Sequence, residues 1–209
     1  MATATLIERA LGAAAAQPPP DDAMSQRILD AALDLVAASG LRNLTMDDVA
    51  ARAAVGRMTV YRRFGDRERL VDALAIREVQ RCLAELDAAV DPGDPIAEQI
   101  ADGFSAALRL IREHPLLDRF ARYEPETALE ALNADGAAIF AMSRAFAAAL
   151  LREAQERGEV GDLDADHAAE LLVRLGVSFV LIPSTALPLD EDERAREVAR
   201  GLIAPILGG

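Results

Sequence analysis

The sequence predicts an all-α protein in which a small basic head precedes a larger, acidic helical body. Apolar residues recur at helical spacing along most of the 209 residues, and Gly or Pro stands at the breaks. The net charge is −13, yet residues 52–69 hold six Arg against two acidic residues, a local charge of +4. Residues 91–209 hold 11 Arg against 22 acidic residues. We expect an arm at 1–23, a head at 24–70 and a body at 71–209.

The arm at 1–23 contains a run of small residues and prolines that can bury little apolar surface, so we expect it to be disordered. Acidic Glu8 and the shortness of the apolar run argue against a signal peptide. No later segment reaches about 18 uncharged apolar residues, the length that spans a bilayer. The sequence therefore predicts no membrane span and a cytoplasmic location.

A first helix is expected at 24–39, where Gly40 ends it. The residues expected to face inward are spaced four, four, three and one positions apart, as on one side of a helix: Met24, Ile28, Ala32, Leu35 and Val36. The next helix should begin at Met46, because Thr45 followed by Asp48 can satisfy the free amides of a helix start. Gly56 is the expected flexible corner after this short helix.

The segment after Gly56 has two different faces. Val60 and Phe64 lie four residues apart and can enter a core, while the opposite face carries Arg57, Met58, Tyr61 and Arg62. Arginine and tyrosine can bind phosphate or base edges, and a methionine can contact a thymine methyl. These residue types favour DNA binding, but a helical corner with a solvated basic face explains the spacing equally well.

The pattern resembles the DNA-binding signature of the TetR family of transcriptional regulators. Residues 45–70 read Thr-x-x-x-Val-Ala-x-x-Ala-x-Val-x-Arg-x-Thr-Val-Tyr-x-x-Phe-x-Asp-Arg-x-x-Leu. The resemblance implies a three-helix helix-turn-helix head on a larger bundle for ligand binding and dimerisation. Two positions depart from the family: Ala54 stands where Gly is frequent, and Gly56 stands where a capping Ser is frequent.

The outward face and the resemblance together predict which residues bind double-stranded DNA. Tyr61 is an expected phosphate contact, and so is Arg67, which matches a position that is usually Lys or Arg in the family. Four residues are the expected base contacts: Arg57, Met58, Thr59 and Arg62. Thr45, at the start of the preceding helix, completes the predicted DNA-binding set.

The body divides at Gly, Pro and Asp. Asp66 should cap a connecting helix that runs to about Ala89, and the sequence Asp-Pro-Gly-Asp-Pro at 91–95 ends it. Further helices are expected at 95–113, at 115–122 and at 126–157, with breaks at Pro115, Pro125 and Gly158.

The segment 164–183 is apolar on almost every side, so it must be covered on more than one. Ala169, Gly176 and Ser178 are small enough to admit a second helix. A last helix should follow with one apolar face: Ala195, Val198, Leu202 and Ile206. We expect a homodimer through 164–206, built as a four-helix interface. The alternative is that both helices are simply buried within one chain.

No catalytic arrangement is recognisable in the sequence. His114, His167 and the single Cys82 do not stand at metal-ligand spacings, and phosphate-binding and nucleophile-elbow motifs are missing. The sequence therefore predicts neither an enzyme, nor a metal site, nor a cofactor.

The resemblance implies a small-molecule effector that binds among the middle helices. The candidate lining residues are Phe104, Leu108, Phe120, Tyr123, Phe140, Phe146 and Phe179, with His114, Arg119 and Arg174 as polar anchors. Ordinary core packing of the same aromatics remains an alternative. The predicted function is a ligand-responsive repressor that binds a palindromic operator as a homodimer. The alternative is an α-helical ligand carrier or enzyme with a vestigial DNA-binding head.

Overall fold

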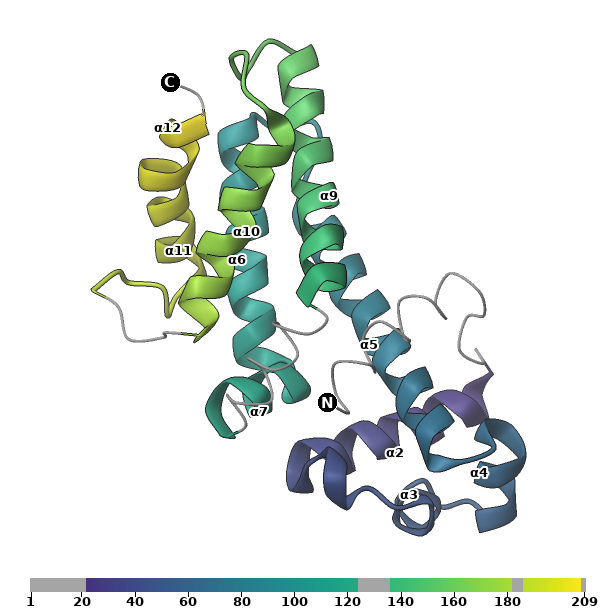
Figure 1. Cartoon of the computed structure of the whole chain (residues 1–209). Helices are drawn as coiled ribbons and strands as arrows, with labels where there is room; N and C mark the ends of the chain where they lie inside the picture. Colours follow the sequence, from purple (N-terminus) through teal and green to yellow (C-terminus); the bar gives the residue numbers. More distant parts are fainter. Residues whose placement is uncertain (1–21, 124–135, 182–185, 208–209) are drawn as a thin grey trace. The chain divides into compact units, whose positions relative to one another are not determined.

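The computed structural model describes residues 22–123, 136–181 and 186–207, and these form helices joined by turns (Figure 1). Within those ranges there is no β-strand, which confirms the predicted all-α class. The chain divides into two compact units. Unit 1 comprises Met1–Arg81 with Pro115–Asp135, and unit 2 comprises Cys82–His114 with Gly136–Gly209. Most of the predicted arm, and residues 126–135 of the helix predicted at 126–157, lie outside the described residues.

Unit 1 holds the predicted head. Its elements are α2 (Ala23–Ser39), the 3-10 turn η1 (Leu41–Asn43), α3 (Met46–Arg52), α4 (Arg57–Phe64), the first part of α5 (Arg67–Ala89) and α7 (Pro115–Tyr123). Ile28, Leu29, Val49, Val60 and Leu70 are completely inaccessible to solvent at its centre. The predicted inward residues therefore form one core, and α7 adds Leu116 to it.

The capping residues of the head act largely as the sequence predicts. The hydroxyl of Thr45 accepts the Asp48 backbone N–H at 3.1 Å and donates to the Asp48 carboxylate at 2.6 Å. Asp66 accepts the backbone N–H of Arg69 at 2.9 Å and so caps α5. Helix starts were predictable because each cap is a local hydrogen bond between residues three apart.

The turn between α3 and α4 corrects the prediction for Gly56. Gly56 has an ordinary extended conformation, with φ −67° and ψ 140°. Ala54 instead takes the left-handed conformation, with φ 53°. The chain reverses two residues earlier than expected, and it does so at a residue whose Cβ makes that conformation unfavourable.

Unit 2 is built around α6 (Ile96–Glu113). Its other elements are α9 (Gly136–Glu156), α10 (Ala165–Leu181), α11 (Asp192–Val198), the π-helical turn η2 (Ala199–Ile203) and α12 (Ala204–Leu207). One apolar cluster joins α9 and α10 through Ala148, Leu151 and Ala169. A second cluster joins α6 to η2 through Ala101 and Ile203.

The last helix buries residues that are four positions apart. Ala195, Ala199 and Ile203 are buried, whereas Leu202, on the predicted apolar face, is 56% exposed. Residues four apart share one side of a helix, and Ala199 and Ile203 pack with Ala101 of α6. The predicted apolar face was expected to meet a second subunit, and its Leu202 is not covered within unit 2.

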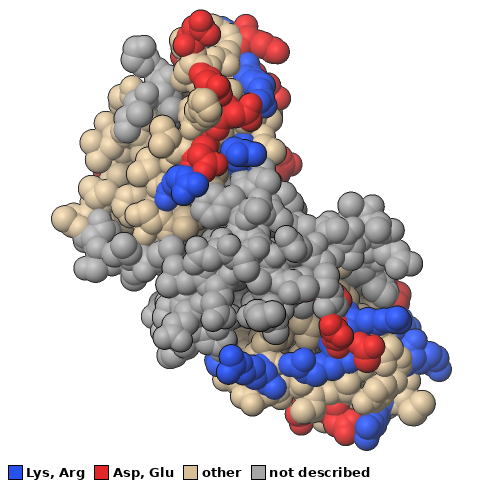
Figure 2. Space-filling model, viewed as in Figure 1, with Lys and Arg blue, Asp and Glu red and all other residues tan. Residues whose placement is uncertain are grey.

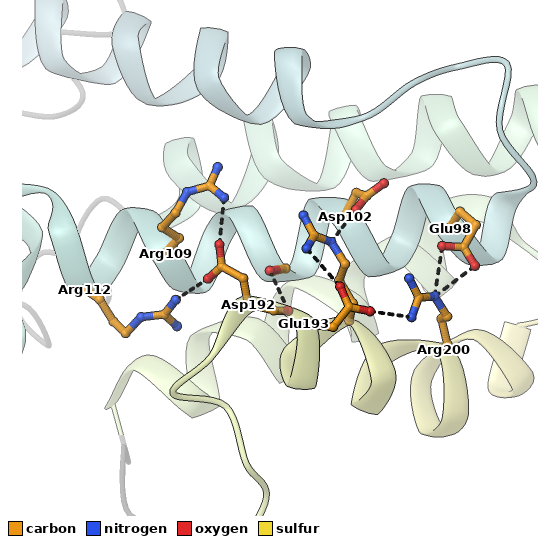
Figure 3. A network of polar contacts seen from close by, with 9 residues as sticks. Glu98, Asp102, Arg109, Arg112, Asp192, Glu193 and Arg200 are labelled. Atoms are coloured by element: carbon orange, nitrogen blue, oxygen red, sulfur yellow. Dashed lines mark hydrogen bonds and ion pairs between the residues drawn. The ribbon is translucent and has the colours of Figure 1, made fainter.

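Salt bridges also hold α11 and η2 against α6 (Figure 3). Asp192 accepts hydrogen bonds from Arg109 at 2.9 Å and from Arg112 at 2.6 Å. Arg196 donates to Asp102 at 2.7 Å, and Arg200 to Glu98 at 2.9 Å. Burial opposes the charge on Asp192, but the two guanidiniums outweigh it and lower its pKa. The order of these pairs runs oppositely in the two helices, so it specifies an antiparallel arrangement.

Replacing Ala54 with Gly should stabilise unit 1. In the folded state, the left-handed conformation is about 1 kcal/mol or more less favourable for Ala than for Gly. In the unfolded state, the greater conformational entropy of Gly costs stability of about 0.4–1 kcal/mol. We expect a net gain of up to about 1 kcal/mol by chemical denaturation. The control is Ala51→Gly in the exposed face of α3, which should cost about 1 kcal/mol because its conformation is helical. Equal losses in both variants would contradict the assigned strain.

Candidate nucleic-acid interface

Helix α4 presents the side chains that the sequence assigned to DNA. Val60 is inaccessible and Phe64 is 5% exposed, so this face anchors the helix in the head. On the other face Met58 is 75% exposed, and Arg57 and Arg62 are also exposed. An exposed Met beside two Arg offers apolar contact for a thymine methyl and donors for guanine or phosphate.

Arg63 fixes the far end of α4 to the start of α2. Its guanidinium lies 2.5 Å from the Asp22 carboxylate and 2.8 Å from the Ser25 hydroxyl. The Ser25 hydroxyl first, and then the backbone of Ser25 and the charge of Arg63, lower the pKa of Asp22 to about 2, although burial opposes this. The stabilisation from this carboxylate is present above its ordinary value of 3.8 and is lost as the pH falls through about 2.

At the other end of α4, Arg57 is held by two neighbours. Its Nε lies 2.8 Å from Asp47 Oδ1, and its Nη2 donates to the Tyr61 hydroxyl at 3.4 Å. Its guanidinium carbon lies 5.3 Å from the centre of the Tyr61 ring. The hydrogen bond with Tyr61 and the charge of Asp47 raise the pKa of Arg57. Sequence reasoning missed Asp47, because the capping pattern drew attention to Asp48 beside it.

Several arginines of the basic segment 52–69 are engaged by groups within the head and are therefore less available to DNA than the local charge suggests. Arg52 pairs with Asp34 at 2.6 Å, and Arg67 donates through Nε to the Leu44 carbonyl at 2.8 Å and through Nη2 to the Leu41 carbonyl. Within residues 22–123, Arg62 has no ion pair. Figure 2 shows Arg interleaved with acidic side chains on the visible face of unit 1. Arg62 is thus the arginine of α4 most available to a phosphate or a base.

Three other predicted DNA contacts occupy different settings. The Thr45 hydroxyl is engaged by the cap of α3, Thr59 is half-buried, and Tyr61 stacks with Arg57. Arg67 braces the segment before α3, as described above. The α4 residues lie together, whereas Thr45 and Arg67 begin other helices.

A buried arginine in α5 was not found by sequence reasoning. Arg77 is only 4% exposed and donates to Asp30 at 2.7 Å and to Glu78 at 2.6 Å. Its Nη1 also lies 3.3 Å from the backbone carbonyl of Gln26. Because an unpaired buried guanidinium is costly, this cluster fixes α5 against α2. An arginine on the apolar stripe of a helix, seven residues after Leu70, was the available signal.

The candidate effector residues fall in both units. In unit 2, Phe104 of α6 and Phe179 of α10 meet edge to face, with ring centres 5.7 Å apart. Leu108 is buried, and His114 and Phe146 are half-buried. Arg174 is 64% exposed and pairs with Glu170 at 2.6 Å on the surface of α10. The structure therefore brings two of the predicted aromatics into contact and places Arg174 toward solvent.

The remaining candidates lie on α7, in unit 1, or outside the described side chains. Arg119 donates to the carbonyl of Ala37 at 3.1 Å and so binds the end of α2. The side chains of Phe120, Tyr123 and Phe140 are outside the described residues, although all three positions are helical. Arg119 thus has a local partner in the head, which the sequence did not indicate.

The described residues contain neither a membrane span nor a metal-binding cluster. None of the helices there is both long and apolar enough to cross a membrane. No group of three or more His, Cys, Asp or Glu within the same ranges is placed to hold a metal ion.

Comparison with known proteins identifies the head. The family model for "Bacterial regulatory proteins, tetR family" matches residues 28–74, which extend from α2 into α5. The HTH-type transcriptional regulator AlkX of Mycobacterium tuberculosis is 27% identical over 180 residues, covering 85% of this chain and 82% of that protein.

Solved structures extend the likeness over the whole fold. The TetR family repressor AlkX from Dietzia, implicated in biodegradation of n-alkanes, is 26% identical, with a TM-score of 0.57 over 86% of this chain and 95% of that one. GusR from Salmonella enterica has a TM-score of 0.62 at 22% identity, over 87% of this chain and 94% of that one. Residues 28–74 thus carry the helix-turn-helix head of the TetR family, and the chain as a whole is similar to TetR-family transcriptional regulators. Regulators of this family are generally transcription factors without enzymatic activity.

Arg67→Ala should lower the stability of the head by about 1 kcal/mol, because two charge-assisted hydrogen bonds to backbone carbonyls are lost at a partly exposed site. The measurement is denaturant unfolding followed by helical circular dichroism. Arg69→Ala removes the same charge two residues away and should change stability by less than about 0.5 kcal/mol. If the two variants unfold alike, the bonds from Arg67 do not brace the head.

Proposed function

We propose that this TetR-family regulator is a repressor that binds a palindromic operator as a homodimer and leaves it when a small molecule binds. The observation that carries the proposal is the α4 face, on which exposed Arg57, Met58 and Arg62 stand opposite the anchoring Val60 and Phe64. A short helix fixed by its apolar face, with such residues outward, fits a major groove.

The proposed roles divide into two kinds. Arg57, Met58, Thr59 and Arg62 read bases, while Tyr61 and Arg67 contact phosphate, and Thr45 lies at the edge of the contact. Arg67 can serve twice, because Nε and Nη2 bind carbonyls while Nη1 keeps its donors. We assign DNA binding to 24–70 and effector binding with dimerisation to 71–209. Contacts from α7 to α2 mean that the head also relies on a later segment.

The dimer proposal rests on apolar side chains that unit 2 leaves uncovered. Leu171 and Leu175 of α10 are 58% and 38% exposed, and Leu202 of η2 is 56% exposed. Figure 2 shows mostly uncharged residues where Figure 1 places α10 to α12. Ala169, expected to face a partner, is instead fully buried within the unit. The proposed interface within 164–206 therefore uses Leu171, Leu175 and Leu202, with Gly176 beside them.

The effector proposal rests on an aromatic contact between two helices of unit 2. Phe104 and Phe179 bring α6 and α10 together through aromatic contact, and Leu172 packs near them. Such side chains favour an apolar ligand. Because a 26% identical relative is implicated in n-alkane biodegradation, n-alkanes and their oxidised derivatives are the first compounds to test.

Selection from random duplexes should return a palindrome whose half-sites lie about 34–36 Å, or a multiple, apart. Arg62→Ala should then weaken binding by about 1–3 kcal/mol at one base pair per half-site, because a base contact is lost. Arg194→Ala is the matched control, since Arg194 is exposed on α11 in unit 2. If the protein bound all duplexes with equal affinity, and that affinity fell steeply as salt was added, the alternative of an α-helical ligand carrier would be favoured.

Gly176→Arg should give a folded monomer. A Cβ at Gly176 meets nothing within 4 Å, so the protomer accommodates the substitution, while a closely packed partner helix does not. Light scattering at micromolar concentration measures the state. Gly161→Arg is the control, because Gly161 is equally open but lies in a loop before α10. A monomeric wild-type protein, or a dimeric Gly176→Arg variant, would refute the interface.

An effector should lower operator affinity, and operator binding should lower effector affinity by the same factor. Titrating n-alkanes or their alcohols into the protein with and without operator measures both factors. Phe104→Ala should weaken the response while leaving operator affinity without effector unchanged. If neither these compounds nor a metabolite extract alters DNA binding, a constitutive repressor remains. If the effector instead raised the affinity of the protein for the operator, it would act as a corepressor.

A further inference from the structure

An exposed ion pair joins the two helices of the helix-turn-helix at its outer surface. Asp47 is the second residue of α3, and Arg57 is the first residue of α4. Their side chains are 57% and 62% exposed, and Arg57 Nε lies 2.8 Å from Asp47 Oδ1. An exposed pair of this kind contributes little to stability, unlike the buried cluster around Arg77.

The contacts of Arg57 leave one part of its guanidinium free. Nε lies 2.8 Å from Asp47 Oδ1 in an ion pair, and Tyr61 supports the group from the side, with its hydroxyl 3.4 Å from Nη2 and its ring centre 5.3 Å from the guanidinium carbon. The other donors of the guanidinium are on its terminal nitrogens, Nη1 and Nη2. Two terminal donors in a fixed plane match the O6 and N7 acceptors of guanine, which lie side by side in the major groove.

We propose that Asp47 is a positioning residue that holds Arg57 for end-on reading of a guanine, and that it thereby sets one base pair of each operator half-site. The inference rests on the proposed DNA-binding function and deepens it. Asp47 does not contact the base; it selects which donors of Arg57 are presented.

The charge of Asp47 acts in the same direction as its geometry. A carboxylate beside Arg57 offsets the positive charge that would attract any phosphate, while the hydrogen-bond donors that face a neutral guanine stay in place. Asp47 therefore reduces binding to DNA in general and favours binding to one sequence. Its removal should raise affinity for random DNA while weakening discrimination, a combination that loss of a phosphate contact cannot produce.

A purely structural role makes a different prediction. Arg57 lies at the positive end of the α4 dipole, where a cation is unfavourable, and Asp47 offsets this. If that were its whole role, Asp47→Asn would lower thermal stability and leave base preference unchanged. Base preference is therefore the readout that separates the two roles.

The experiment compares full-length wild type, Asp47→Asn and Asp34→Asn by operator selection and by titration with matched duplexes. Asp47→Asn should lose about five- to fiftyfold of the preference for guanine at one position per half-site. Its affinity for random duplex should rise, and the salt slope should steepen by about 0.9 per head as Arg57 becomes free for phosphate. Asp34→Asn frees Arg52 from an equally exposed ion pair between α2 and α3, so it should keep the wild-type base preference.

Two further variants make the outcome decisive. Asp47→Glu keeps the carboxylate and should recover part of the guanine preference, and circular dichroism checks that each variant is folded. In an Arg57→Ala background, Asp47→Asn should not alter base preference further, because Asp47 acts through Arg57. An unchanged guanine preference in Asp47→Asn overturns this inference. A wild-type protein that selects no sequence overturns the proposed function instead.

Discussion

The forked guanidinium of arginine is the interaction on which both units depend. All 22 basic residues of the chain are Arg. In unit 1, Arg63 and Arg77 bind carboxylates at the start of α2 and within it, and Arg67 binds backbone carbonyls of the segment before α3. Each arginine thus joins its own helix to another part of the chain. One residue type thus both holds the head together and offers donors to DNA. Net charge alone cannot distinguish the two uses; the partners of each guanidinium can.

Local features of the fold were predictable, and pairings between helices were not. Caps such as Thr45 with Asp48 depend on residues three apart, so they are visible in the sequence, as is the inward spacing of Val60 and Phe64. Asp47 with Arg57 depends on how two helices cross, which ten residues of separation do not specify. The positive φ of Ala54 was missed because the conformational freedom of glycine placed the expected bend at Gly56, two residues later.

The ion pairs between α6 and α11 have a consequence for the apolar surface of unit 2. They fix the register of α11 and η2 on α6, with Ala195, Ala199 and Ile203 inward. Leu202 is left outside by the same register. The exposed leucines are therefore a product of how unit 2 packs.

The covalent links between the units determine where an effector could act on the head. Helix α5 leaves unit 1 after Arg81, and the chain returns at Pro115, where α7 begins. On the head side, Arg67 of α5 binds carbonyls of the segment before α3, Arg77 binds α2, and Arg119 of α7 binds the end of α2. None of these three arginines contacts α4 in its described hydrogen bonds. In the proposed mechanism, a shift in unit 2 would reach α4 directly through α5, which follows α4 after two residues and shares its core. It would also reach α4 through α2 and α3, which Arg63 and Arg57 join to it. Repression and its release would then depend on the same ion pairs that orient the reading face.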